Sequence, residues 1–162
     1  MADMMPHIFA VERGVNMKSC YREIAVATTE NFGVHDVTDH VRAIVRESGV
    51  REGVVTVTSR HTTCAISVNE NEERLLEDIR EFFLRLAPPD ARYLHNDLHL
   101  RENIPPDEPE NAHAHLIAMM LGNSESLCVH EGEPVLGRYQ SVLLVEMDGP
   151  RDRTVAVMVC GM

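Results

Sequence analysis

The order of strand-like and helix-like segments constrains this fold more than any single motif does. The run Gly53 to Thr58 is β-branched at almost every position, which favours a buried strand over a helix. Further extended runs are expected at 22–29, 64–68, 126–130, 141–146 and 154–160. These strands do not alternate regularly with helices, so the pattern predicts an α+β fold with an antiparallel or mixed sheet.

The clearest helix is predicted from about Glu70 to Arg85. Asn69 and Glu72 have the spacing of a capping box, and apolar residues recur at helical intervals up to Pro88-Pro89. Two shorter helices are expected. The first begins near Asp36 or Thr38 and ends at Gly49, and the second covers about 111–121 and ends at Gly122.

Five prolines and little periodicity between residues 88 and 110 predict a long loop, of the kind that often carries function. We expect no domain boundary there, because neither flank is large enough to fold alone. A chain of 162 residues with 44% hydrophobic residues therefore forms one domain, 1–162.

Charge and cysteine usage exclude several classes of function. The formal charge of -11 argues against nucleic acid or an anionic membrane as a partner, since both need clustered Lys and Arg. The four cysteines form no CxxC pair, so neither a thiolate zinc site nor a disulfide framework is indicated. With no signal-like start and no span of about 20 apolar residues, the expected location is the cytoplasm.

Histidines gather in three short polar segments between residues 61 and 115. They are His61, His95, His99, His113 and His115. Imidazoles bind metals as neutral bases and titrate near physiological pH, so their presence among Asp, Asn and Glu suggests a chemical site. For any one of them a surface position in a polar loop is the simpler interpretation, and we expect His113 to be a solvent residue.

Several motifs in a fixed order resemble the YjbQ-like family. They are His61-Thr62-Thr63, Asn69-Glu70, Tyr93-Leu94-His95-Asn96-Asp97, Asn111-Ala112-His113-Ala114-His115-Leu116, Gly137-x-x-Gln140 and Glu146-x-Asp148-Gly149-Pro150-Arg151-x-Arg153. The resemblance covers about Arg22 to Gly161. It departs from the family pattern at Cys64, where a small residue is usual, and at Tyr139, where Trp is usual. Neither change removes an ionisable group.

What the resemblance implies is a YjbQ-like fold, in which mixed or antiparallel sheets form a small sandwich with two to three helices, assembled as a homotrimer. The family is associated with a secondary thiamine-phosphate synthase activity. The chain is therefore expected to join a pyrimidine pyrophosphate to a thiazole phosphate and to release pyrophosphate, so a small phosphorylated molecule is the expected partner. The site is expected to combine the His61 segment, the His95 to Asp97 loop and His115, at a subunit boundary.

Three residues are candidates for catalysis. His61 follows a predicted buried strand and, with Glu70, is a candidate for proton transfer. His115 matches the family position and lies in the first turn of a predicted helix, where backbone N–H groups favour an anion. Glu70 is stabilised by the helix dipole whatever its role.

The candidates for substrate binding each have a structural alternative. Thr62 and Thr63 supply hydroxyls suited to phosphate. Asn69 either caps the following helix or contacts substrate, and Gln140 either orients substrate or bonds across strands. Arg151 and Arg153 are expected either to clamp a phosphate or pyrophosphate or to form intersubunit or surface ion pairs with the abundant acidic residues.

A divalent metal, Mg or Zn, is the one cofactor considered, with His95, Asp97 and His115 as ligands. In an extended segment His95, Asp97 and His99 would share one face and offer two nitrogens and one oxygen. The alternatives to an enzyme of the transferase class are a trimer that binds a metal or an anion without turnover, and a metal-dependent phosphoester hydrolase.

Overall fold

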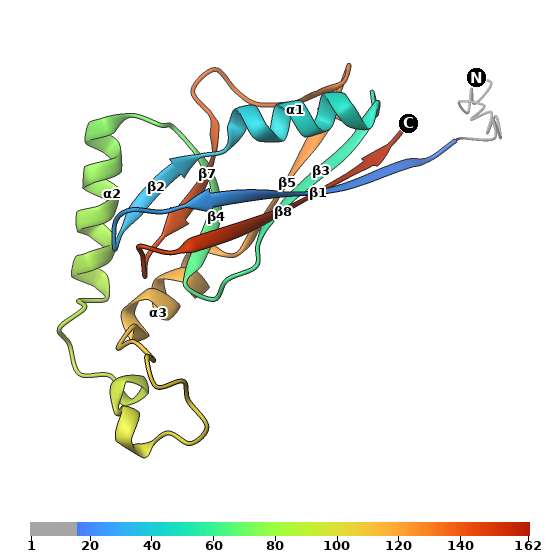
Figure 1. The fold of residues 1–162 in the computed structure, drawn as a ribbon. Helices are drawn as coiled ribbons and strands as arrows, with labels where there is room; N and C mark the ends of the chain where they lie inside the picture. Colours follow the sequence, from blue (N-terminus) through green and yellow to red (C-terminus); the bar gives the residue numbers. More distant parts are fainter. Residues whose placement is uncertain (1–15) are drawn as a thin grey trace, which may run out of the picture.

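The computed structural model describes residues 16–162 (Figure 1). In that range the helices are α1 (Thr38–Ser48), α2 (Glu73–Leu86) and α3 (Ala112–Leu121), with two short 3₁₀ turns, η1 (Leu94–Asn96) and η2 (Leu98–Leu100). The strands are β1 (Lys18–Ala27), β2 (Gly33–Asp36), β3 (Gly53–Ser59), β4 (Cys64–Asn69), β5 (Ser124–His130), β6 (Glu133–Pro134), β7 (Ser141–Glu146) and β8 (Asp152–Gly161).

The strands form two sheets in which every pairing is antiparallel. The larger sheet has the order β1-β8-β3-β5-β6 and the smaller one the order β2-β7-β4. This arrangement confirms the predicted α+β class and the antiparallel sheets. The short strands β2 and β6 were not predicted, because runs of four and two residues carry too little alternation to detect.

The main core lies between the two sheets. Val57 and Val157 point into it from the larger sheet, and Ile66 and Leu144 from the smaller one, each no more than 1% exposed. Helix α1 adds Val41, Ile44 and Val45 to the same cluster. The β-branched run that indicates a buried strand in the sequence is β3, whose alternate residues enter this core.

A second cluster covers the opposite face of the smaller sheet. Helix α3 contributes Ala114 and Ile117, which pack with Val145 and Met147 from the end of β7. Helix α2 also lies on this side, yet none of its residues is fully buried. The molecule is thus a β-sandwich with α2 and α3 beside one sheet (Figure 1).

Large apolar side chains are exposed on α3 and on the outer face of the larger sheet. Helix α3 has no charged residue on any side, but Leu116, Met119 and Met120 are exposed, Met119 by 84%. A helix that is apolar all round is normally buried. On the outer face of the larger sheet, Tyr21 and Met158 are also exposed.

The capping of α2 differs from the prediction. The helix begins at Glu73, and its N-cap is Glu72, whose carboxylate accepts hydrogen bonds from the backbone N–H groups of Arg74 and Leu75. Asn69 is instead the last residue of β4, and its Oδ1 accepts from the N–H of Glu70. The predicted capping box at Asn69 is therefore wrong, since β4 continues through that residue and a local side-chain bond satisfies the next amide.

The segment around His95 is not extended. His95 lies in η1 and His99 in η2, with Asp97 between the two 3₁₀ turns. The prediction that His95, Asp97 and His99 share one face of an extended segment is wrong, because 3₁₀ geometry has about three residues per turn. Along residues 16–162, no helix combines the length and apolar character needed to cross a membrane.

Candidate functional site

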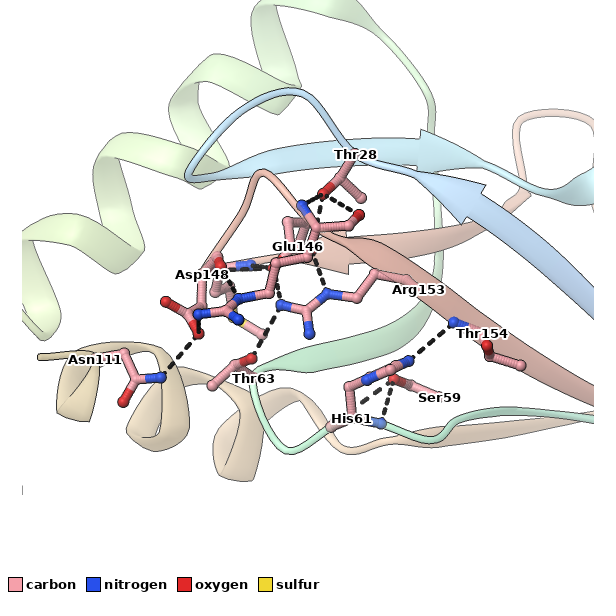
Figure 2. Close-up of polar contacts among 11 residues, drawn as sticks. Thr28, Ser59, His61, Thr63, Asn111, Glu146, Asp148, Arg153 and Thr154 are labelled. Carbon is pink, nitrogen blue, oxygen red and sulfur yellow. Dashed lines mark hydrogen bonds and ion pairs between the residues drawn. The ribbon is translucent and has the colours of Figure 1, made fainter. Parts of the chain in front are cut away.

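His61 is held in place at one end of the sandwich, in the turn between β3 and β4. The ring Nε2 of His61 accepts a hydrogen bond of 2.9 Å from the backbone N–H of Thr154, and the backbone N–H of His61 donates to Ser59 Oγ at 3.3 Å (Figure 2). Burial lowers the pKa of His61, and the nearby Arg153 lowers it further. A neutral imidazole whose Nε2 accepts a hydrogen bond carries its proton on Nδ1, so the ring of His61 has one N–H, at Nδ1, to donate.

A hollow of about 620 Å³ opens beside His61 and reaches α3. His61, Thr62 and Arg60 line it from the β3–β4 turn, and His115 and Met119 line it from the helix. The structure therefore brings together His61, Thr62 and His115, which lie far apart in the sequence. The volume falls in the range typical of small-molecule sites.

His115 contacts a second histidine from the preceding loop. The rings of His95 and His115 meet edge to face, with centroids 4.9 Å apart and an interplanar angle of 71°. Burial lowers the pKa of His115, and the neighbouring His95 lowers it further. The lowered pKa keeps His115 neutral at neutral pH, and a neutral imidazole has one ring N–H to donate and one nitrogen that can accept.

The same pair is the part of the predicted metal site that comes together. Nε2 of His95 is buried and has no hydrogen-bond partner, which suits a nitrogen that ligates a metal. Within residues 16–162, however, no three His, Cys, Asp or Glu side chains gather closely enough to hold an ion. Two imidazoles suit a transition metal such as Zn better than Mg, and a complete site would need further ligands from outside residues 16–162.

Arg153 and Glu146 form a buried ion pair that sequence reasoning did not identify. The guanidinium donates from Nε to Oε2 at 2.5 Å and from Nη2 to Oε1 at 2.6 Å (Figure 2). Burial would raise the pKa of Glu146, but the hydrogen bonds from Arg153 and the Asp148 amide hold it below its ordinary value. The alternation Val142, Leu144, Glu146 on the core face of β7 was the available signal.

The two predicted arginine ligands therefore have separate surroundings. Arg153 is only 5% exposed, and its Nη2 also donates to Thr63 Oγ1 at 3.1 Å, so both Arg153 and Thr63 are engaged inside the protein. Arg151 is exposed, donates to the backbone oxygen of Asp148 and pairs with its carboxylate at 3.3 Å. The surface ion-pair alternative describes Arg151, whereas the ion pair of Arg153 is buried within one chain and differs from that expectation. A role in binding substrate stays a prediction for both arginines.

Asn111 and Asp148 join the first turn of α3 to the turn after β7. Asn111 Nδ2 donates to Asp148 Oδ2 at 2.8 Å, although Asn111 is only 6% exposed (Figure 2). Neither residue was singled out as a candidate from the sequence. The only signal in the sequence was that Asn111 belongs to the motif that contains His115 and that Asp148 belongs to the motif that begins at Glu146.

Asn69, Glu70 and Gln140 lie at the other end of the smaller sheet. Asn69 pairs with Ser141, whereas Cys64, at the start of the same strand, pairs with Glu146. Six residues of strand span roughly 17–20 Å, so these three candidates do not reach the hollow beside His61 in one chain. Gln140 is tied locally, because its Oε1 accepts from the N–H of Gly137 at 2.7 Å.

Cys64 replaces the usual small residue of the family pattern and is completely buried. Burial raises the pKa of its thiol to about 12, and the neighbouring Glu146 raises it as well. A thiol in this state is a packing residue and not a nucleophile.

Two antiparallel sheets packed face to face, with a histidine-lined pocket where β3 meets β4, define an α+β sandwich protein. Residues 22–162 match the family model described as "UPF0047 protein YjbQ-like". The chain belongs to this UPF0047 family of YjbQ-like proteins, as the motifs indicated.

Relatives and solved structures agree with that assignment. The chain is 38% identical over 148 residues to a UPF0047 protein of Methanothermobacter thermautotrophicus, a match that covers 91% of this chain and 96% of the relative. A YbjQ-like protein of unknown function from Sulfolobus solfataricus superposes with a TM-score of 0.83 at 36% identity, over 91% of this chain and all of that one. A hypothetical protein from Aeropyrum pernix gives a TM-score of 0.79 at 38% identity, covering 88% and 98% of the two chains.

Proposed function

We propose that this chain binds a small phosphorylated molecule in the hollow between the β3–β4 turn and α3 and acts on it with His61 and His115. One observation carries the proposal: both imidazoles line the same hollow, and burial lowers the pKa of each, so both are neutral at neutral pH. Neutral imidazoles are the form in which histidine serves as a base, a hydrogen-bond donor or a metal ligand.

Both histidines act as hydrogen-bond donors in this proposal. His61 uses Nε2 to accept from Thr154, so only its Nδ1–H remains to stabilise negative charge on a substrate oxygen. No backbone N–H among the described residues donates to the His115 ring, and we assign the N–H of this neutral imidazole as a second hydrogen-bond donor to the phosphorylated substrate. Glu70, the other base considered from the sequence, belongs to this site only if a second copy of the chain brings it there.

Phosphate recognition rests on the turn after β3. Thr62 is exposed at the hollow and offers a free hydroxyl and a backbone N–H. Arg60 also lines the hollow and is 57% exposed at its side chain, where it pairs with Glu23 at 2.6 Å. A phosphorylated ligand would compete with the exposed Glu23 carboxylate for this guanidinium, because an exposed ion pair is weak and a guanidinium binds phosphate well.

The finer activity that we propose is thiamine-phosphate synthesis. The thiazole nitrogen attacks the methylene carbon of the pyrimidine pyrophosphate, the carbon–oxygen bond breaks, and pyrophosphate leaves with the electron pair. This step needs stabilisation of the leaving group more than it needs a base. His61, Thr62 and Arg60 are the groups beside the hollow suited to that task.

The second candidate function is a non-catalytic trimer that holds a metal or an anion. The unpartnered Nε2 of His95, next to His115, favours a metal in particular. Trimer formation would cover the exposed apolar side of α3 and supply Asn69, Glu70 and Gln140 from a neighbouring subunit. Hydrolysis of phosphoesters by the metal-loaded protein would identify the hydrolase alternative, and the cytoplasmic location stays a prediction.

The test compares wild type with His61→Gln, His115→Gln and the control His40→Gln, which removes an exposed histidine from α1. Each protein is incubated with Mg²⁺ or Zn²⁺ and both substrates, and thiamine phosphate and pyrophosphate are measured. We expect losses of about 100-fold or more for the two site variants, in line with the loss of one hydrogen-bond donor to the negative charge that develops on the leaving group. Equal product formation by all four proteins would refute the assignment of the site.

A further inference from the structure

A second hollow lies on the other side of the first turn of α3. Its volume is about 380 Å³, and it is bounded by α2, α3, the loop between β1 and β2, and the turn after β7. Polar side chains line its wall, namely Asn31, Arg80, Glu110, His113 and Asp148. Phe32 and Met147, both buried, give it an apolar side. None of its lining residues lines the first hollow.

His113 and His115 serve different hollows although they are two residues apart. Residues at this spacing on a helix point about 200° apart, which places His115 on the first hollow and His113 on the second. The expectation that His113 is a solvent residue is wrong: burial lowers its pKa, and its Nδ1 is buried without a hydrogen-bond partner. At neutral pH His113 therefore adds no positive charge to the second hollow.

The carboxylate of Asp148 is only partly satisfied by the protein. Its Oδ2 accepts from Asn111 Nδ2 at 2.8 Å and lies 3.3 Å from Arg151 Nη2. Among residues 16–162 no donor reaches its Oδ1, although the side chain is only 14% exposed. Asn111 itself is nine-tenths buried and its Oδ1 has no partner, so this junction has more acceptors than donors.

The charges around this hollow favour a cation. Arg80 is paired with Glu77 at 3.2 Å and Arg151 with Asp148, whereas Glu110 has no ion-pair partner among the described residues. The Glu110 carboxylate, the Oδ1 atom of Asp148, a neutral imidazole and an apolar side remain for a ligand. A protonated amine supplies N–H donors and positive charge together, and an attached carbon chain fits against Phe32 and Met147.

We propose that this second hollow is a binding site for a small organic cation, an ammonium or amidinium group on a short apolar body, held by Asp148 and Glu110 beside His113. The site is independent of the proposed function of the first hollow. The Asp148 amide donates to Glu146 Oε1 at 2.8 Å, so the carboxylate that would hold the cation belongs to a chain segment anchored on the buried ion pair.

The test is a nuclear magnetic resonance titration with three probes, methylammonium, butylammonium and phenethylammonium, and with butyrate as the anion of matched size. We expect saturable shifts of the His113 ring and the Met147 amide with at least one amine, with dissociation constants in the millimolar range, roughly 4 kcal/mol of binding free energy. Butyrate should leave both signals in place. No shift with any amine, or equal shifts with butyrate, would overturn the proposal.

Variants separate Asp148 from general surface charge. Asp148→Asn should weaken binding about tenfold or more, since it removes a charge-assisted hydrogen bond. Glu110→Gln should weaken it less, and Asp90→Asn, an exposed carboxylate in the same long loop, should leave it unchanged. Because Asp148→Asn alters a structural contact, its amide spectrum is compared first, and Glu110→Gln provides the test if that variant does not fold. Unchanged affinity in the folded variants would contradict the proposal.

Discussion

The backbone N–H of Thr154 donates to Nε2 of His61 across 2.9 Å, which ties the turn after β3 to the start of β8. A protonated imidazole carries hydrogen on both nitrogens and cannot accept this bond. Protonation of His61 therefore breaks a hydrogen bond between two strand ends. It also places a positive charge in a partly buried environment, which is unfavourable.

The first prediction concerns the tautomer of His61. In ¹⁵N spectra at neutral pH we expect His61 as the Nδ1–H tautomer, because its Nε2 accepts the hydrogen bond from Thr154. A dominant Nε2–H form of His61 would contradict the hydrogen bond to Thr154. It would also remove the assignment of Nδ1–H as the donor to substrate.

The second prediction concerns stability and pH. The pKa values of His61, His113 and His115 all lie below their ordinary value of 6.5, so the unfolded chain binds more protons than the folded one in slightly acidic solution. The stability of the fold with these three histidines neutral is fully present above pH 6.5 and is lost as the pH falls toward their pKa values in the folded state. The free energy of unfolding in urea should therefore decrease between about pH 8 and about pH 5, and His61→Gln should make this decrease smaller.

His130 provides the opposite sign and serves as the control for that experiment. Its hydrogen bond to Glu52 raises its pKa, so its stabilisation is present below pH 6.5 and is lost as the pH rises through the folded-state pKa. The pair is fully exposed and screened by salt. His130→Gln should leave the acid-side decrease in place, and a stability that rises steadily toward pH 5 would show that the buried histidines do not dominate.

The third prediction concerns the buried ion pair. Arg153→Met leaves the Glu146 carboxylate, which is 0% exposed, without its cation, and we expect a loss of about 3–5 kcal/mol in the free energy of unfolding. The double variant Glu146→Leu/Arg153→Met removes both charges and should recover most of that loss. Additive losses in the double variant would contradict direct coupling.

The fourth prediction concerns thiol reactivity. Cys64 is completely buried and its pKa is raised to about 12, whereas Cys128 is exposed on β5. A thiol reagent at mildly alkaline pH should label Cys128 rapidly in the folded protein and Cys64 only after denaturation. Mass spectrometry of the labelled peptides gives both rates, and rapid labelling of Cys64 in the native protein would contradict its burial.

The fifth prediction concerns the exposed apolar side of α3. If neighbouring copies in a trimer cover Met119 and Met120, light scattering should give a mass of three chains, and Met119→Glu/Met120→Lys should lower it without a net change in charge. The control Glu77→Lys/Arg80→Glu exchanges charges on α2 and should keep the larger mass. A monomeric wild type would contradict the trimer implied by the family resemblance.

The strands and helices that form the core were predictable because their patterns are local. The β-branched residues of β3 and the apolar stripe of α2 each indicate an element without knowledge of its neighbours. The start of α2 was misjudged by three residues, since Asn69 and Glu72 both have side chains that accept backbone N–H bonds and only the length of β4 decides between them.

The candidate site was predictable only in part, because contacts between distant segments leave weak traces in a single sequence. The histidine motifs located His61 and His115, which the structure brings to one hollow. Arg153 is in phase with the buried Val155 and Val157 of β8, but this alternation does not identify Glu146 as its partner. Nor does it show that Arg151, two residues earlier, lies outside the strand. The different surroundings of His113 and His115 also required the position of α3 between two hollows.

The ion pair formed by Glu146 and Arg153 joins β7 of the smaller sheet to β8 of the larger one, and both side chains are buried away from water. Replacing one of the two residues leaves the opposite charge buried without a partner inside the sandwich. Replacing both with uncharged residues removes both charges. Over evolutionary time the two positions should thus be inherited as one unit, with intermediate sequences that carry a single change removed by selection.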